Sequence, residues 1–384
     1  MKFMHLGDLH LGKSLCDFDL IEDQKYILEE ILEIIKEESV DALLIAGDVY
    51  DKSVPSEAAT HLLDWFLRSL SERKIKTFII SGNHDSDERL NFGSSLFESN
   101  GIFISSLFKG ELFKKTLEDE YGEINVFLLP FVKASEVRHF YPDEKIENYD
   151  DAVRTVIDKA NVDATKRNII ISHQFVAGQE SDPKLSGSEG VACQTVGTVE
   201  KIPASVFDDF DYAALGHIHG AQSVGRKEVR YSGSPLKYSL SEANNSKSVP
   251  IITLGKKGMI DISLHELKPM RDLRHLKGQL QTLLDTKNVC GTEDFIYATL
   301  TDENIIDGAM GIFRQTYKNT VRIDYDNSHT KAIENINISE VTTARSYDEL
   351  ISEFYKKMYG TDISEEEMEV MKKIAKEVGI IEAD

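Results

Sequence analysis

Residues 42–51 read ALLIAGDVYD, and this stretch decides how the surrounding chain folds. Its first five residues form a continuous apolar run, which is typical of a strand buried on both faces of a sheet. Gly47 then permits a sharp turn out of that strand. Asp48 follows, and a carboxylate at this point offers two oxygens with which to bridge a pair of metal ions. The stretch therefore predicts a buried strand with a metal-ligating carboxylate at its carboxyl end.

Four other short apolar runs also end in polar residues of ligand type. The residues that follow these runs are Asp8, His10, Asn83, His84, His173, His217 and His219. Ligands collect beyond the carboxyl ends of strands in α/β sheets, so we expect one site on an α/β layered core. The competing interpretation, in which each Asp or His only caps its own loop, has to hold for all five runs at once.

The predicted ligands are oxygen and imidazole donors without thiolate. This set suits manganese, iron or zinc, and it fits calcium or a closed structural zinc site poorly. Two such ions, about 3.5–4 Å apart, can activate a water and stabilise an in-line displacement at phosphorus. The residues therefore indicate phosphoester hydrolysis.

The composition limits the partners of the chain. A formal charge of −22 over 384 residues argues against nucleic acid bound across the whole surface, since such binding depends on Lys and Arg. A polyanion has to be held locally, by bound cations or by a basic stretch such as Lys268, Arg271, Arg274 and Lys277. The alternative for that stretch is a solvated linker face. Three isolated cysteines indicate neither a disulfide framework nor a thiolate zinc site.

Nothing in the sequence indicates a membrane. No apolar run approaches the roughly 18 residues of a membrane span, and no signal peptide fits before Asp8. We therefore expect a cytoplasmic protein.

Four regions follow one another along the chain. Residues 1–267 alternate buried strands with amphipathic helices and end in a predicted β-hairpin. We expect a linker over residues 268–279. A strand, helix, strand pattern over Phe295–Leu300, Ile305–Tyr317 and Val321–Tyr325 predicts a small α+β domain in residues 280–340.

Residues 341–384 predict a helix pair. Ser346 and Ser364 each begin a capping box, and Gly360 and Gly379 end the two helices. The apolar faces consist of Leu350, Ile351, Phe354, Tyr355 and Met358 on the first helix, and Met368, Met371, Ile374, Ala375 and Val378 on the second. These faces pack either on the body of the chain or on another protein.

The motif series D-x-H, GDxxD, GNHD, H and GHxH resembles the calcineurin-type metallophosphoesterase superfamily. The resemblance implies two ions: Asp8, His10, Asp48 and His219 hold one, and Asp48, Asn83, His173 and His217 hold the other. It implies that His84 protonates or steadies the leaving oxygen, and that Asp51 orients the His84 imidazole. The alternative role for His84 is to support the metal loop.

Longer stretches are similar to the SbcD family, the nuclease subunits of bacterial SbcCD complexes. They are residues 47–56, 172–175, 215–219, 231–239 and 267–273. The resemblance implies a four-layer α/β/β/α metallophosphoesterase sandwich in residues 1–267, a DNA-binding cap domain in 280–340 and a C-terminal helix-loop-helix in 341–384.

The same resemblance implies an activity and its partners. It implies a DNA nuclease with two Mn²⁺ per chain, for which Mg²⁺, Fe²⁺ or Zn²⁺ are possible substitutes. Such an enzyme acts as an exonuclease on duplex ends and as an endonuclease on single strands or hairpins. It implies a homodimer formed through the nuclease domain and an SbcC-like SMC ATPase bound by the C-terminal helices. The complex of these proteins would act in DNA break and palindrome processing.

Two other functions compete with this one. A small-molecule or cyclic-nucleotide phosphodiesterase would use the same metal site, and a non-enzymatic scaffold would keep only binding. Lys52 and Ser53 stand where Ser/Thr protein phosphatases have Arg-Gly, which argues against that class.

Overall fold

The computed structural model describes most of the chain. The described residues are 1–178, 182–187, 194–195, 198–199, 201–328, 330, 347–359 and 361–377. The chain divides into two compact units, residues 1–273 and 274–384.

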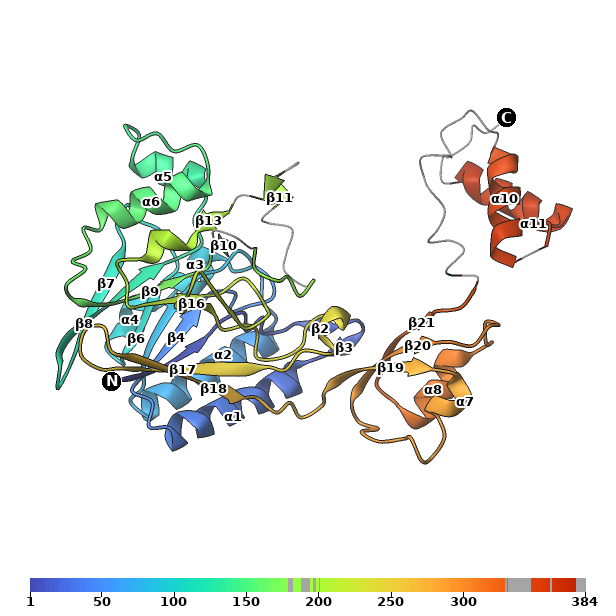
Figure 1. Ribbon diagram of the computed structural model, residues 1–384, viewed down its shortest axis with the longest axis horizontal. Coiled ribbons are helices and arrows are strands. Elements are labelled where there is room, and N and C mark those ends of the chain that lie inside the picture. The colour runs from blue at the N-terminus through green and yellow to red at the C-terminus, as the bar shows by residue number, and fades with distance from the viewer. Residues whose placement is uncertain are drawn as a thin grey trace. The chain divides into compact units, whose positions relative to one another are not determined.

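Two six-stranded mixed sheets form the centre of the first unit (Figure 1). In spatial order, the first sheet contains β18 (Ile260–Glu266), β17 (Ser248–Leu254), β1 (Lys2–Leu6), β4 (Ala42–Ala46), β5 (Lys76–Ile80) and β6 (Ile102–Ser105). The second contains β15 (Gln222–Val224), β16 (Arg226–Tyr231), β14 (Tyr212–Leu215), β9 (Arg167–Ser172), β8 (Gly122–Leu129) and β7 (Phe113–Asp119). The predicted buried strands and the predicted hairpin, which is the antiparallel pair β17 and β18, are confirmed.

Strands β1, β4, β5 and β6 run parallel, as do β8, β9, β14 and β16. Alternate side chains of both sheets meet between them, including Phe3, Leu44, Ile171 and Tyr212. Because neighbouring residues of a strand point to opposite faces, Leu43 and Ile45 face the other side of the first sheet, where they are also buried. Burial on both faces explains why β4 is apolar throughout.

Helices cover the outer faces. α1 (Ile21–Glu37) and α2 (Glu57–Glu72) lie against the first sheet, and α2 begins at Ser56, whose side chain accepts a hydrogen bond from the Ala59 N–H. α5 (Ala134–Phe140) and α6 (Tyr149–Lys159) cover the second, in one core with Phe127 and Ile170. The predicted α/β/β/α sandwich is confirmed.

Shorter elements connect these layers. They are β2 (Ser14–Leu15), β3 (Phe18–Asp19), α3 (Asp87–Asn91), α4 (Ser94–Glu98), β10 (Val176–Ala177), β11 (Gln194–Thr195), β12 (Thr198–Val199), β13 (Ile202–Pro203), and the 3₁₀ helices η2 (Ala204–Phe207) and η3 (Leu240–Glu242). None of the described helices is long and apolar enough to cross a membrane.

The second unit contains a small sheet with helices. β19 (Leu273–Gly278), β20 (Phe295–Leu300) and β21 (Thr320–Tyr325) form the sheet, and α7 (Leu280–Leu283) and α8 (Ala309–Thr316) accompany it. The predicted strand, helix, strand order is confirmed, although α8 starts four residues later than expected. Gly308 precedes it at a φ of +67°, outside the helical region.

The linker predicted for residues 268–279 is wrong in its second half, because Leu273–Gly278 is the edge strand β19. Leu276 packs against the core of the small domain, and Arg274 and Lys277 pair with Asp294 and Asp326. These contacts draw the segment into the sheet.

The helix pair consists of α10 (Tyr347–Tyr359) and α11 (Glu365–Glu377). The capping box at Ser364 is confirmed: its hydroxyl accepts from the Glu367 N–H, and Glu367 accepts from the Ser364 N–H. Tyr347 donates to the Met371 carbonyl at 3.2 Å, which joins the helices. The predicted features at Ser346, Gly360, Val378 and Gly379, and the side chain of Met358, lie outside the described residues.

Arg167 links several segments at the amino end of β9. Its side chain is 4% exposed, pairs with Asp119 at 2.6 Å and donates to the Glu123 and Gly255 carbonyls. We expect Arg167→Met to lower the free energy of unfolding by about 3 kcal/mol, because the Glu123 and Gly255 carbonyls lose a donor and Asp119 keeps only the N-terminal ammonium of Met1 as a charged partner. Urea unfolding followed by the fluorescence of Trp65, the single tryptophan, reports on this unit.

Lys145, which is 83% exposed and pairs with Glu147, provides the control. Lys145→Met should leave the unfolding midpoint unchanged, since exposed ion pairs contribute little. Equal midpoints for both variants would contradict the structural role given to Arg167.

Candidate metal centre

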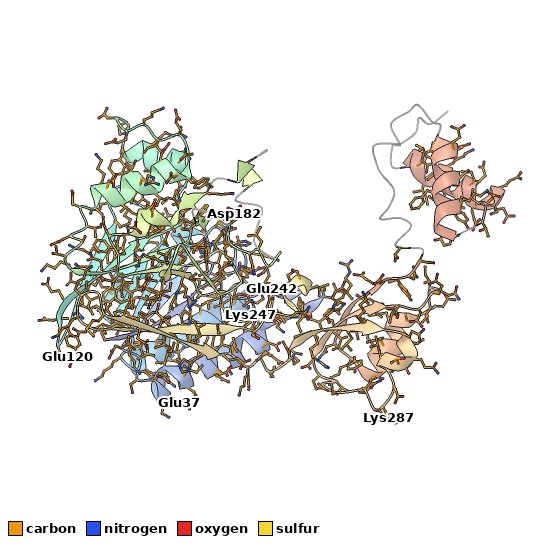
Figure 2. All side chains as sticks on the ribbon, viewed as in Figure 1. Glu37, Glu120, Asp182, Glu242, Lys247 and Lys287 are labelled. Atoms are coloured by element: carbon orange, nitrogen blue, oxygen red, sulfur yellow. The ribbon has the colours of Figure 1, made fainter. Side chains whose placement is uncertain are left out.

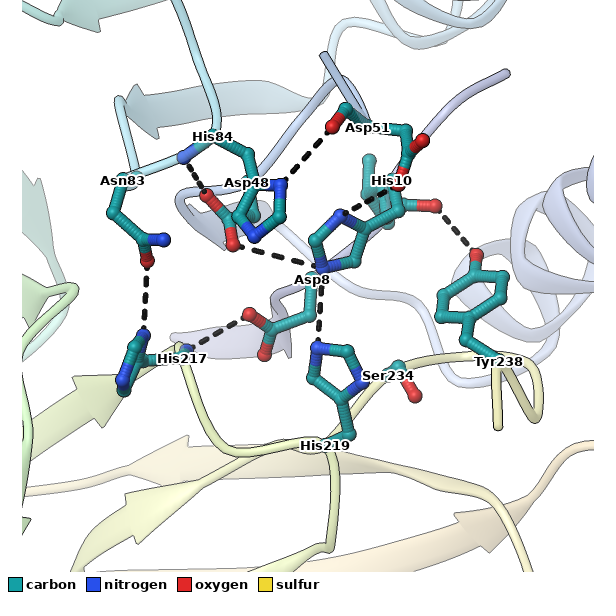
Figure 3. Close-up of polar contacts among 12 residues, drawn as sticks. Asp8, His10, Asp48, Asp51, Asn83, His84, His217, His219, Ser234 and Tyr238 are labelled. Atoms are coloured by element: carbon teal, nitrogen blue, oxygen red, sulfur yellow. Dashed lines mark hydrogen bonds and ion pairs between the residues drawn. The ribbon is translucent and has the colours of Figure 1, made fainter. Parts of the chain in front are cut away.

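The carboxyl ends of five strands, three from the first sheet and two from the second, meet at one site (Figure 3). Asp8 follows β1, Asp48 follows β4, Asn83 follows β5, His173 follows β9 and His217 follows β14. His10 and His219 lie two residues beyond Asp8 and His217. The site therefore forms where the two sheets approach each other.

Four of these residues have left-handed backbone conformations. Their φ angles are +54° at Asp8, +44° at His10, +48° at Asp48 and +96° at His217. Non-glycine residues seldom adopt such angles, and they concentrate at functional sites, where the surrounding structure enforces them. Here the Asp8 N–H donates to the Gly47 carbonyl at 3.1 Å, and the His10 N–H to the Asp48 carbonyl at 2.9 Å. These bonds fix the β1 and β4 loops to each other.

Gly216 allows the two sheets to approach closely. A Cβ at this position would lie 1.9 Å from the Ala46 carbonyl oxygen and 2.7 Å from His173 Nδ1. Only a residue without a side chain fits between β4 and β14 at this distance. The glycine before the His217 and His219 pair is thus a requirement of the site.

The first group of ligand atoms centres on two imidazoles. His10 Nε2 lies 3.1 Å from His219 Nε2 and 3.6 Å from Asp48 Oδ2. Asp8 is fully buried, and its Oδ2 has no hydrogen-bond partner among the described residues. A buried carboxylate oxygen without a partner is costly, and a cation bound between these atoms would compensate it.

The second group centres on Asn83. Its Oδ1 lies 3.1 Å from His173 Nε2 and 2.9 Å from His217 Nδ1, and His173 Nε2 lies 3.4 Å from Asp48 Oδ2. The Nδ1–H of His173 donates to the Ala46 carbonyl at 2.7 Å. That bond directs Nε2 toward the group, as is usual for metal-binding histidines. Asp48 contributes to both groups.

The pKa values reflect how closely these charges are packed. Burial alone would raise the pKa of Asp48, but the His173 imidazole, followed by His10 and His84, holds it well below its usual range. Burial lowers the pKa of His173, yet the neighbouring Asp48 carboxylate outweighs burial and raises it to about 9. Burial, together with His173, lowers the pKa of His217 to about 3.

The donor set fits the implied metals. It combines carboxylate, amide and imidazole donors without thiolate. The ligand atoms of Asp8, His10 and His219 lie within 4.8 Å of one another. The same limit holds for the ligand atoms of Asp8, Asp48 and His173. The structure therefore brings together all seven residues that the sequence predicted as metal ligands.

His84 and Asp51 also lie at the site, but the contact between them differs from the predicted one. We expected the Asp51 side chain to orient the His84 imidazole, but the main-chain carbonyl of Asp51 accepts its Nδ1–H at 3.0 Å. The Asp51 carboxylate instead pairs with Lys13 at 2.7 Å and lies 3.7 Å from His10 Nδ1. Lys13 draws this carboxylate away from His84 and toward the first group.

Sequence reasoning assigned no role to several supporting residues. Asp85 accepts from the N–H groups of Val49, Tyr50 and Gly82, and burial, then Asp48, raises its pKa to about 6. The Tyr238 hydroxyl donates to the Leu9 carbonyl at 2.5 Å. Asp85 stands inside the GNHD motif, and Tyr238 stands inside the family-like stretch of residues 231–239, so both could have been considered from the sequence.

Glu242 was also missed. It is fully buried, with its Oε1 3.7 Å from His219 Nδ1. Burial would raise the pKa of Glu242, but the His219 imidazole and the Lys247 ammonium lower it to about 2.

Comparison with known proteins agrees with this geometry. Residues 1–221 match the family model described as Calcineurin-like phosphoesterase. The SbcD subunit of the nuclease SbcCD from Staphylococcus epidermidis (strain ATCC 12228 / FDA PCI 1200) is 34% identical over 382 residues, which cover 97% of each chain. The chain belongs to the SbcD family of calcineurin-like phosphoesterases.

Two further matches concern the rest of this SbcD-family chain and its fold. Residues 269–359 match a model described as Type 5 capsule protein repressor C-terminal domain. Among solved structures, a dimetal phosphatase from Danio rerio is 10% identical, with a TM-score of 0.41 over 70% of this chain and 98% of that chain. This likeness is too weak to add to the family assignment.

Asp48 provides a direct test of the SbcD-family metal centre, because it belongs to both ligand groups. Asp48→Asn should weaken the binding of both ions by at least about tenfold, since metal ligands act as charged donors. Titration of the metal-free chain with Mn²⁺ in a calorimeter measures both sites. Asp41→Asn, at the other end of β4, is the control and should bind two ions as the parental chain does.

Proposed function

We propose that the chain is the DNA nuclease subunit of an SbcCD-type complex. It would hydrolyse phosphodiesters with two divalent metal ions, as an exonuclease on duplex ends and an endonuclease on single strands or hairpins. The observation that carries the proposal is the convergence of the seven predicted ligands from two sheets, in a chain that matches a nuclease subunit along 97% of its length. Manganese is the metal that we propose, with Mg²⁺, Fe²⁺ or Zn²⁺ as substitutes.

The ligand groups would divide between two ions. Asp8, His10, Asp48 and His219 would hold one ion, and Asp48, Asn83, His173 and His217 the other. When bound, such ions supply an activated water and neutralise charge on the phosphoryl oxygens. The left-handed loops and their main-chain hydrogen bonds hold Asp8, His10 and Asp48 in a defined geometry.

His84 is placed to transfer a proton. The main-chain N–H of His84 donates to Asp48 Oδ1 at 2.9 Å, and its imidazole ring packs edge-on against the ring of His10, with centroids 4.8 Å apart. Because Nδ1–H is used by the Asp51 carbonyl, Nε2 is the nitrogen left to face a leaving oxygen, and it donates a proton there when the imidazole carries both protons. The side chain is partly exposed, so a substrate can reach it. Asp51 would act on His84 through its main chain.

DNA is favoured over the small-molecule alternative because the similar relative is a nuclease subunit. The basic stretch considered for local DNA binding is largely occupied within the chain: Arg271 pairs with Asp23, Arg274 with Asp294 and Lys277 with Asp326. We therefore propose that other surfaces, including those of a partner, contribute most of the positive charge for DNA.

The C-terminal helix pair would bind an SMC-like ATPase. Tyr347 and Tyr355 join α10 to α11, yet Phe354 and Ile374, on the predicted apolar faces, remain 49% exposed. Exposed apolar side chains on paired helices favour a protein partner. Four further points stay predictions. They are the DNA-binding role of residues 280–340, the homodimer through the nuclease domain, the role in break and palindrome processing, and the cytoplasmic location.

Cleavage of DNA tests the proposed activity. An end-labelled linear duplex and a hairpin should be cut by the purified chain with Mn²⁺ and left intact with a chelator. His84→Ala should reduce the rate by about 10²–10⁴, because it removes general acid catalysis, while two ions still bind. The exposed His139, replaced by Ala, is the control and should cut at the parental rate.

Two other outcomes would each contradict one part of the proposed function. Parental cleavage by His84→Ala would remove His84 from the mechanism. Rapid hydrolysis of a cyclic nucleotide without any cleavage of DNA would favour the phosphodiesterase alternative.

Removal of residues 346–384 tests the partner surface. The shortened chain should lose association with the SMC-like ATPase in a pull-down and still cut small DNA substrates. Phe354→Glu combined with Ile374→Glu should have the same effect in the full-length chain, because charges replace exposed apolar contacts. Glu369→Gln, on an exposed position of α11, should associate normally; undiminished binding by the deletion would refute this role for the helices.

A further inference from the structure

A buried carboxylate lies directly behind one of the proposed metal ligands. His219 presents Nε2 to His10 at 3.1 Å, and Glu242 Oε1 lies 3.7 Å from the other ring nitrogen, Nδ1. Both side chains are buried, with exposures of 2% for His219 and 0% for Glu242. The separation exceeds a hydrogen bond, so in this structure the contact is electrostatic.

Lys247 holds this carboxylate and the His219 main chain together. Its ammonium donates to Glu242 Oε2, to the His219 carbonyl at 2.9 Å and to Ser234 Oγ at 2.8 Å. An ammonium has three donors, and these bonds use all of them. Figure 2 labels Glu242 and Lys247 next to each other inside the first unit.

A metal-binding imidazole must be neutral, with its proton on the nitrogen that does not face the ion. A nearby carboxylate stabilises that proton and fixes the orientation of the ring. We infer that Glu242, held by Lys247, is a positioning residue that sets the tautomer and orientation of His219 for the metal shared with Asp8, His10 and Asp48. This inference rests on the proposed two-metal centre.

The arrangement serves only one of the two ligand groups. His173, in the second group, is oriented by the Ala46 carbonyl at 2.7 Å, which needs no side chain. His217 approaches Asn83 through Nδ1 at 2.9 Å. Loss of Glu242 should therefore affect one ion and spare the other, which a purely structural ion pair would not do.

Metal binding by the full-length, metal-free chain tests this role without reference to DNA cleavage. Glu242→Gln keeps the shape and removes the charge. Glu242→Leu combined with Lys247→Met removes both buried charges, so that neither remains without a partner if the single variant fails to fold. In both, one of the two Mn²⁺ ions should bind about 10–100-fold more weakly and the other as in the parental chain. Calorimetry gives the two affinities, and electron paramagnetic resonance distinguishes a coupled ion pair from a single ion.

Arg167→Met is the matched control, since it breaks a largely buried ion pair at the opposite end of β9 and should leave both affinities unchanged. Two unchanged affinities in the Glu242 variants would overturn the inference, and so would equal weakening of both ions. A parental chain that binds two ions but cuts no DNA would refute the proposed nuclease activity and leave this inference standing.

Discussion

The carboxylate of Asp48 lies between an imidazole from each sheet, 3.6 Å from His10 Nε2 and 3.4 Å from His173 Nε2. Much of the first unit serves this arrangement. β4 is buried on both faces, so the strand that ends at Asp48 is held firmly, and Gly47 turns the chain at a φ of +81° to direct the carboxylate into the site. Because Asp48 belongs to both ligand groups, the positions of the two groups cannot vary independently.

The two sheets contribute different kinds of residues to this centre. The first sheet provides the two carboxylates, the amide of Asn83 and one imidazole, and the second provides the remaining three imidazoles. The pKa directions follow from this division: imidazoles depress the pKa of Asp48, and Asp48 raises that of His173. Charges brought together from opposite sheets compensate each other, which makes a dense set of buried ionisable groups compatible with a stable core.

Much of this arrangement could be predicted from the sequence. Strand ends follow from short apolar runs, and parallel strands bring their carboxyl ends to one edge, so Asp8, His173 and His217 could be grouped without coordinates. Other features depend on contacts between distant residues. The direction of the Asp51 side chain is set by Lys13, the pairing of β19 by contacts with acids in the small domain, and the burial of Glu242 by Lys247. No local spacing encodes these choices.

The position of β1 has a consequence for how the protein is made. β1 is the first strand in the sequence but lies between β4 and β17, and its antiparallel partner begins at Ser248. Pairing across so long a sequence separation forms slowly, and during synthesis it must wait until that segment has left the ribosome. The last predicted ligand, His219, is also made late. A nascent chain can therefore pair β1 with β4 early, which places Asp8 and His10 beside Asp48, but the rest of the centre can be completed only when the first unit is nearly whole.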